Sequence, residues 1–586
     1  MLGLKNLAGL VVVFLLLPFR VHAAIYEVGP DQQYSAVGDV PWESLEPGDQ
    51  VRIHWRAEPY KEKFVICRQG TEQAPIVVMG VAGPQGQKPV LDARDATTRS
   101  ELNFWNESRG LVKIGGANSP PDTMPQWIVL QDLVLRSARE PFSFTGRDGL
   151  TDYAENAAAV YIEKGHHIIL RGLEITDSGN GLFTGHQTED LLVEGCYIHS
   201  NGVEGSIYEH NNYSSGIGVV FQFNHFGPLR DNCPGNNLKD RSAGLVVRYN
   251  WIESGNRQLD LVDAEDSHDL VESPLYHQTY VYGNILVEPD GAGNSQIVHY
   301  GGDSGTVDDY RKGTLYFHFN TVISTRSGNT TLFRLSTNDE SADCRNNIIF
   351  ATAGGNRLAM LDESGQLKLR SNWISAGWVD GHSGIDGSID DDGSNITGDS
   401  PGFRDFSSGD YSLDADSVCI DRAGGLDAAI SDQYSPTMQY VPHLGSIERF
   451  AQGGVLDLGA FEFCPDGQCQ VPDGGIDDAG TDDAGIEDAG TEDAGTDDAD
   501  DAGADLQDSG TDSGSDPGGE TGMDGTDMGD ELGSDAGTDA GSTTDSGLNG
   551  RVQGSCGCGQ GAANDEAGII VFLILVWAIT KKRRLA

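Results

Sequence analysis

The chain has 586 residues, of which 90 are Asp or Glu and 38 are Lys or Arg, so its formal net charge is −52. A protein this acidic is not expected to bind nucleic acid. Its nine cysteines are too few to make a chain of this length a disulfide scaffold.

Residues 1–23 have the pattern of a cleaved secretory signal peptide. Lys5 precedes an apolar run from Leu7 to Pro18, and the short segment Val21-His22-Ala23 stands before Ala24. The sequence therefore predicts that the protein leaves the cytoplasm.

A body predicted to span residues 24–465 follows the signal peptide. It opens with residues 47–51 (PGDQV) and the segment IHWRAEPYKEKFVI, and it closes with residues 455–462 (VLDLGAFE). These segments resemble the first coils and the last strand of extracellular β-helix polysaccharidases of the pectate-lyase type. The resemblance implies a right-handed parallel β-helix and a polysaccharide partner, and it identifies no particular polysaccharide.

Six strand-like segments, each interrupted by one asparagine, recur along the body. The asparagines are 26, 34, 36, 27 and 25 residues apart: Asn224, Asn250, Asn284, Asn320, Asn347 and Asn372. A period of roughly 20 to 50 residues is typical of a solenoid. Because the repeats are short β-type runs separated by Gly, Asn, Asp and Ser, and lack helical patterns, the sequence predicts an all-β, single-stranded right-handed parallel β-helix. The asparagines are expected to accommodate the bend between strands and to stack through their amides.

A second strand is expected before each asparagine strand, at residues 206–211, 237–242, 257–263 and 295–301 among others. If Leu238, Leu259 and Ile297 point into the core, the two-residue period of a strand turns Lys239 and Arg241 outward. Neighbouring coils are about 4.8 Å apart, so charged side chains of adjacent coils are expected to touch on this outer face.

The predicted catalytic site is a groove on that face. Its expected residues are Lys239, Arg241, His210, His299 and Asp260. The two longest repeat intervals place insertions at this level, and insertions at one level of a solenoid commonly build its binding face.

These residue types suit the cleavage of a uronic-acid polysaccharide by β-elimination. The reaction needs a cation to neutralise the substrate carboxylate, a base of lowered pKa and a donor for the leaving oxygen. Lys239 beside Arg241 has its charged form disfavoured, which favours its use as the base. Asp263, Glu265 and Asp266 supply the oxygen ligands that Ca²⁺ prefers, and are the expected metal ligands.

The segment 236–252 (NNLKDRSAGLVVRYNWI) resembles the lyase family that contains alginate lyases and chondroitinase B. In that family a catalytic Lys followed by Ser precedes an Arg-x-Asn strand, so the resemblance implies that Lys239 is the base. The family's second motif, Leu-x-Leu-Arg-His-Gly, is only partly present, because Val262 stands in place of its Arg. Arg241 or Arg257 is then the candidate for the acid.

Residues 466–550 are predicted to be a disordered acidic spacer. From residue 471 to residue 550 there are 25 Asp plus Glu and no Lys or Arg, with pentads such as TDDAG and TEDAG. Such a segment has too few apolar side chains to offset the entropy of its chain. The part of the exported chain before residue 471, residues 24–470, carries a net charge of −32.

Residues 551–586 are predicted to be a second targeting segment, in addition to the signal peptide. Cys556 and Cys558 precede an apolar run from Ala567 to Thr580 and the basic cluster 581–584 (KKRR). This order resembles the C-terminal sorting tails of myxobacterial surface proteins, which implies cleavage near the cysteines and display on the outer surface. The alternative is a short tail that anchors the protein in the envelope membrane.

Two other functions stay open. Asp260 with Asp263 or Asp266 could supply the two carboxylates of a β-helix glycoside hydrolase. A surface-displayed β-helix could also bind glycans or cells without catalysis, as an adhesin. In each case the sequence predicts a monomer.

Overall fold

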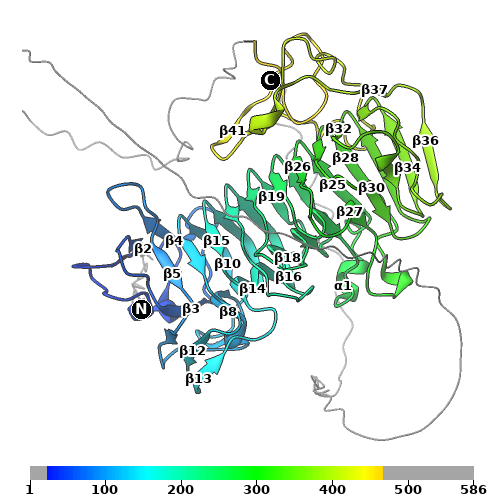
Figure 1. Cartoon of the computed structure of the whole chain (residues 1–586). Helices are drawn as coiled ribbons and strands as arrows, with labels where there is room; N and C mark the ends of the chain where they lie inside the picture. The colour runs from blue at the N-terminus through cyan, green and yellow to red at the C-terminus, as the bar shows by residue number, and fades with distance from the viewer. Residues whose placement is uncertain (1–22, 466–586) are drawn as a thin grey trace, which may run out of the picture. The chain divides into compact units, whose positions relative to one another are not determined.

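The computed structural model describes residues 23–465. These residues form a solenoid of short parallel strands whose coils follow one another from the N-terminal end to the later coils (Figure 1). The only α-helix in this part of the chain is the single turn α1 (His268–Val271). No helix among the described residues is long and apolar enough to cross a membrane.

One coil illustrates how the chain winds. Strand β21 (Leu238–Asp240) is followed by β22 (Val246–Arg248) and β23 (Trp251–Glu253), and the next coil begins with β24 (Leu259–Leu261). Each strand pairs in parallel with its counterpart one coil further on: β21 with β24, β22 with β25 (Gln278–Tyr282), and β23 with β26 (Ile285–Glu288). Three parallel ladders therefore run along the solenoid, and the expected parallel β-helix is confirmed.

The six predicted asparagines stack as expected. Each is buried, and each Nδ2 donates to the Oδ1 of the next, at 2.9 Å from Asn224 to Asn250 and 3.0 Å from Asn250 to Asn284. The ladder continues beyond Asn372, which donates to Asn395 at 2.9 Å. The bend itself is made by the preceding residue: Tyr249, for example, has a φ of 56°. The expectation that the asparagines themselves take up the bend is wrong, because their role is to satisfy backbone groups between strands.

The interior of the solenoid is a continuous apolar core. Along β22 and β25 the inward residues are Val247 and Val281, which pair in register and are fully buried. The ladders keep this register because a one-residue slip would turn every inward side chain out of the core.

The last part of the described chain packs beside the late coils (Figure 1). It contains the antiparallel pairs β38 (Phe403–Asp405) with β39 (Asp410–Leu413), and β40 (Met438–Val441) with β41 (Gly445–Glu448). Tyr434 stacks on Tyr280 of β25 with ring centroids 3.7 Å apart. Residues 455–462, expected to be a last strand, are not a strand, and the buried Arg449 instead donates to the carbonyl oxygens of Asp457 and Gly459.

The signal peptide, the acidic spacer and the C-terminal segment lie outside the described residues, except for residue 23. The predicted boundaries at 1–23, 466–550 and 551–586 therefore stay predictions.

Candidate active site

The ladder that begins each coil carries a row of polar side chains. In register along it lie Tyr213, Lys239, Asp260, His299 and Arg334, one from each coil. Their neighbours in the strands are core residues, so the period of two turns this row outward. The expected contact between Lys239 and Asp260 is confirmed.

Two details of the expected register are wrong. Leu259 pairs with Val298 rather than Ile297, so His299 falls directly beside Asp260. Residues 206–211 are not a strand, and the strand of this coil is β18 (Asn212–Ser214), which places Tyr213 beside Lys239.

Lys239 is held between two carboxylates. Its Nζ donates to Asp260 Oδ2 at 3.0 Å and to Asp303 Oδ2 at 2.5 Å. Burial lowers the pKa of Lys239, but attraction to Asp260 and Asp303 outweighs burial and the repulsion from Arg241, so the pKa is raised above its usual value. The expectation that Arg241 makes Lys239 a base of lowered pKa is therefore wrong: Lys239 is a cation.

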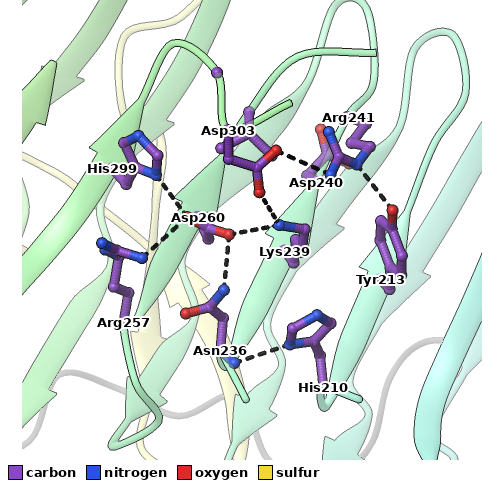
Figure 2. A network of polar contacts seen from close by, with 12 residues as sticks. His210, Tyr213, Asn236, Lys239, Asp240, Arg241, Arg257, Asp260, His299 and Asp303 are labelled. Atoms are coloured by element: carbon purple, nitrogen blue, oxygen red, sulfur yellow. Dashed lines mark hydrogen bonds and ion pairs between the residues drawn. The ribbon is translucent and has the colours of Figure 1, made fainter. Parts of the chain in front are cut away.

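Arg241 lies beside Lys239 and shares its partner. Its Nη2 lies 3.0 Å from Asp303 Oδ1 and 2.7 Å from Glu265 Oε1, and its Nε donates to the hydroxyl of Tyr213 at 2.9 Å. The carboxylate of Asp303 thus bridges the two cations (Figure 2).

Asp260 is the centre of the network. Its Oδ2 also accepts from Asn236 Nδ2 at 2.7 Å, and its Oδ1 lies 2.8 Å from His299 Nδ1 and 3.7 Å from Arg257 Nη1 (Figure 2). Burial raises the pKa of Asp260, but Lys239 and the hydrogen bond from His299 more than offset burial and hold this pKa well below its usual value. Asp260 is therefore a buried anion that orients its neighbours.

His210 has a fixed tautomer. The backbone N–H of Asn236 donates to His210 Nδ1 at 2.8 Å, so the proton of the neutral ring must be on Nε2. Burial, with repulsion from Lys239, lowers the pKa of His210 to about 3, so the ring is neutral. His210 can donate a hydrogen bond into the cleft through Nε2 and has no lone pair there with which to act as a base.

The predicted calcium ligands do not form an oxygen cluster. Asp263 Oδ1 accepts the backbone N–H of Asp303 at 2.8 Å and lies 3.6 Å from Arg241 Nη1, while Glu265 pairs with the same guanidinium. Among the contacts of residues 23–465, no hydrogen bond or ion pair joins Asp266 to Asp263 or Glu265. Within residues 23–465 no group of three or more His, Cys, Asp or Glu side chains is placed to hold a metal ion. A resident Ca²⁺ at this position does not fit, because Arg241 already supplies the positive charge between these carboxylates.

The network lines an open cleft of about 420 Å³. Lys239, Arg241, His210 and Asp260 lie in its wall with Tyr213, Asn236, Arg257, Glu265 and Asp303, and the exposed Ile207 and Tyr208 form its rim. His299 does not line the cleft itself and acts on it through Asp260. The structure thus brings four of the five predicted catalytic residues to one surface.

Sequence reasoning missed Tyr213 and gave no role to Asp303. The signal for Tyr213 was a second asparagine ladder: Asn211 Nδ2 donates to Asn237 Oδ1 at 3.0 Å, which fixes the register of β18 against β21. Asp303 lies in a glycine-containing loop after β27 (Gln296–Tyr300), and no local pattern in the sequence shows where such a loop folds back.

No protein-family model matches the chain, and no curated protein sequence is similar to it. Similar solved structures include an alginate lyase from Paenibacillus sp. str. FPU-7 (11% identity, TM-score 0.37, covering 60% of this chain and 94% of that one). A second is pectate lyase Pel9A (11% identity, TM-score 0.40, covering 75% of this chain and 96% of that one). A third is the GH136 lacto-N-biosidase from Eubacterium ramulus (12% identity, TM-score 0.32, covering 64% of this chain and 67% of that one).

The class is defined by the chain's own strand ladders: it is a parallel β-helix with a polar cleft on one face. At these identities and TM-scores, the likenesses carry no inference about its activity.

Proposed function

We propose that the chain is an extracellular enzyme that cleaves a uronic-acid-containing polysaccharide by β-elimination in the cleft around Lys239. The observation that carries the proposal is the position of the Asp303 carboxylate, which bridges Lys239 and Arg241. A pair of cations that holds one carboxylate in an open cleft can hold the carboxylate of a uronate in the same way. The side chain of Asp303 is 31% exposed, so substrate can displace it more easily than it can move the buried pair.

In this mechanism Lys239 and Arg241 neutralise the substrate carboxylate, which makes the proton on the adjacent carbon easier to remove. Tyr213 is placed to take that proton in its ionised form, which the step requires and which the hydrogen bond from Arg241 Nε to its oxygen would favour. The electrons of the C–H bond form the new C=C bond. The C–O bond to the leaving sugar breaks with its electrons on oxygen, and Tyr213 returns the proton to that oxygen. His210 donates a hydrogen bond through Nε2 to the substrate in the cleft. It does not transfer this proton, because its loss would leave an imidazolate.

The test uses the full-length protein on a panel of alginate, pectate, glycosaminoglycans and neutral glycans, with and without added Ca²⁺. Far-ultraviolet absorbance of unsaturated uronides and reducing ends are followed together. A lyase raises both signals. Tyr213→Phe should lower kcat at least about 100-fold with little change in KM, because proton transfer is lost while the cations stay.

Lys239→Ala should raise KM as well as lower kcat, since it removes one of the two cations of the carboxylate site, which consists of Lys239 and Arg241. Tyr316→Phe, a half-buried tyrosine of another ladder, is the matched control and should leave activity unchanged. Full activity in Tyr213→Phe would contradict the assigned role. Silence on both signals across the panel would favour the adhesin.

A glycoside hydrolase is the second candidate, and one observation favours it. Glu265 Oε1 and Asp303 Oδ1 lie 2.7 and 3.0 Å from the same Arg241 nitrogen. Burial raises the pKa of Glu265, whereas Lys239 and Arg241 outweigh burial at Asp303 and lower its pKa. Two neighbouring carboxyls with opposite pKa shifts can serve as acid and nucleophile. Reducing ends without unsaturated products would identify this reaction.

We also propose that the protein is exported by its signal peptide and displayed at the cell surface or attached to the outer membrane through residues 551–586, as a monomer. Calcium enters as an added component of the assay, with no residue of the cleft assigned to it. Mass spectrometry of the C-terminal peptides from intact cells would test whether the tail is cleaved near Cys556 or Cys558.

A further inference from the structure

A second cavity adjoins the cleft on the side of the preceding coils. It has a volume of about 220 Å³ and shares Asn156 with the first. The loop 203–210 separates the two: Ile207 and Tyr208 line the cleft, while Ser206 and Glu209 line the second cavity. A polysaccharide bound in the cleft can therefore continue past this loop into the second cavity.

The second cavity contains unsatisfied hydrogen-bond acceptors. Glu209 is only 2% exposed, and its Oε2 is buried without a hydrogen-bond partner among the described residues. Asn156 Oδ1 is likewise buried without a hydrogen-bond partner among the described residues. The backbone N–H of Asn156 donates to the other oxygen of Glu209, Oε1, at 3.4 Å. A buried acceptor without a donor costs free energy, which a ligand that donates hydrogen bonds recovers.

The lining of this cavity has an excess of carboxylates, whereas the lining of the cleft has as many cations as carboxylates. Glu140, Glu155 and Glu209 line it, and its one cation, Arg139, is already paired with Asp177 at 2.9 Å. A uronate placed here would meet uncompensated carboxylates, whereas sugar hydroxyls would donate to them.

We propose that the second cavity is a binding subsite for an uncharged, hydroxyl-bearing sugar next to the uronate. Glu209 and Asn156 accept its hydroxyls, and the exposed ring of Tyr208 supplies an apolar face at the crossing between the cavities. This inference rests on the proposed function and narrows it: the substrate is a heteropolysaccharide that alternates acidic and uncharged sugars, rather than a homopolymer of uronic acid.

The test measures binding by isothermal titration calorimetry with the full-length protein. The probes are a tetrasaccharide of unsulfated chondroitin, which alternates a uronate with an uncharged sugar, and a tetramannuronate, in which every unit is acidic. The alternating probe should bind about tenfold more tightly, because one subsite accepts hydroxyls and repels carboxylates.

Glu209→Gln should remove most of that preference by weakening the alternating probe about tenfold. Tyr208→Ala, at an exposed position that folding does not need, should weaken the alternating probe and keep the protein folded. Glu204→Gln, on the same loop but outside both cavities, is the matched control and should change neither affinity.

Equal affinities of the two probes, binding of neither, or a preference that survives Glu209→Gln would each overturn the subsite. The outcomes separate the two proposals. Binding that depends on Glu209 without any turnover keeps the subsite and rejects the lyase. Turnover of a uronate homopolymer that is indifferent to Glu209→Gln keeps the lyase and rejects the subsite.

Discussion

At the scale of single residues, Asp303 occupies the place that the proposed mechanism gives to the substrate carboxylate. Its two oxygens contact different cations, one on Lys239 and one on Arg241. Any anion that enters must compete with Asp303, which therefore lowers the affinity of the cation pair for other anions.

Replacing Asp303 with Asn removes the competing charge while keeping the size of the side chain. We expect Asp303→Asn to bind a uronate oligosaccharide about tenfold more tightly than the natural chain, because the cation pair is freed for the ligand. The control is Glu265→Gln, which also loses a partner of Arg241 but leaves the bridge to Lys239 intact. Calorimetry of both variants measures the difference. Equal affinities would mean that the substrate carboxylate does not displace Asp303.

The residue types of the site could be predicted from the sequence, and their protonation could not. Lys239 and Asp260 lie in strands, and Arg241 directly follows the strand of Lys239, so the two-residue period indicates which of these side chains face outward. The charge of Lys239 depends on Asp260, which the sequence already placed beside it, and also on Asp303, which is 64 residues further along the chain and reaches Lys239 through a loop. A long loop has no periodicity, so the sequence showed one of the two carboxylates that hold the proton on Lys239 and not the other.

At the scale of elements, the asparagine ladder carries the stacking of the coils. Asn284 illustrates its role: the amide accepts from the backbone N–H of Asn250 and donates to the carbonyl of Val247, both at about 3 Å. Six asparagines in register could be recognised in the sequence because their spacing repeats. The two interruptions of that spacing marked the site, but the path of the inserted loops was set by long-range contacts.

Asn284→Ala should lower the free energy of unfolding by about 2 to 3 kcal/mol, because it leaves buried backbone groups on two coils without partners. Urea denaturation followed by circular dichroism gives the value. Asn329→Ala, at an exposed position with one contact to Arg357, is the comparison and should change stability by less than about 0.5 kcal/mol. Equal losses of unfolding free energy in both variants would show that the asparagine ladder stabilises the fold no more than a surface contact does.

The segment beyond residue 400 is tied to the solenoid by a buried histidine. His318 of β28 (Thr314–His318) is fully buried, and its Nε2–H donates to the carbonyl of Tyr434 at 2.9 Å. Burial lowers the pKa of His318 to about 4, against about 6.5 in an unfolded chain. Between these values the unfolded chain binds a proton that the folded chain excludes, so this residue's contribution to stability falls as the pH drops below about 6.5.

We therefore expect His318→Gln to be less sensitive to acid than the natural chain. From about pH 6.5 down to about pH 4, the natural chain should lose up to about 1.4 kcal/mol more per pH unit. Urea denaturation at several pH values measures both slopes, and acid effects elsewhere in the chain cancel in the difference. Parallel slopes would show that His318 takes up a proton without unfolding.

At the scale of the whole molecule, the cation pair of Lys239 and Arg241 lies on an acidic body. Residues 24–470 contain 31 Lys plus Arg and 63 Asp plus Glu. The long-range field of the body therefore repels a polyanion, while the contacts of Lys239 and Arg241 act at hydrogen-bond distance. The two effects differ in range, so salt separates them: screening acts over about 10 Å at 0.1 M and weakens the distant repulsion before the buried contacts.

The kcat/KM for a long uronate-containing polymer should accordingly rise about three- to tenfold between roughly 10 and 150 mM NaCl, since screening removes the barrier to capture. A short oligosaccharide with a single uronate meets less repulsion and should change little over the same range. Initial rates at substrate concentrations below KM measure both quantities. A steady fall of kcat/KM with salt for the polymer would mean that the local cations, rather than the acidic body, govern its capture.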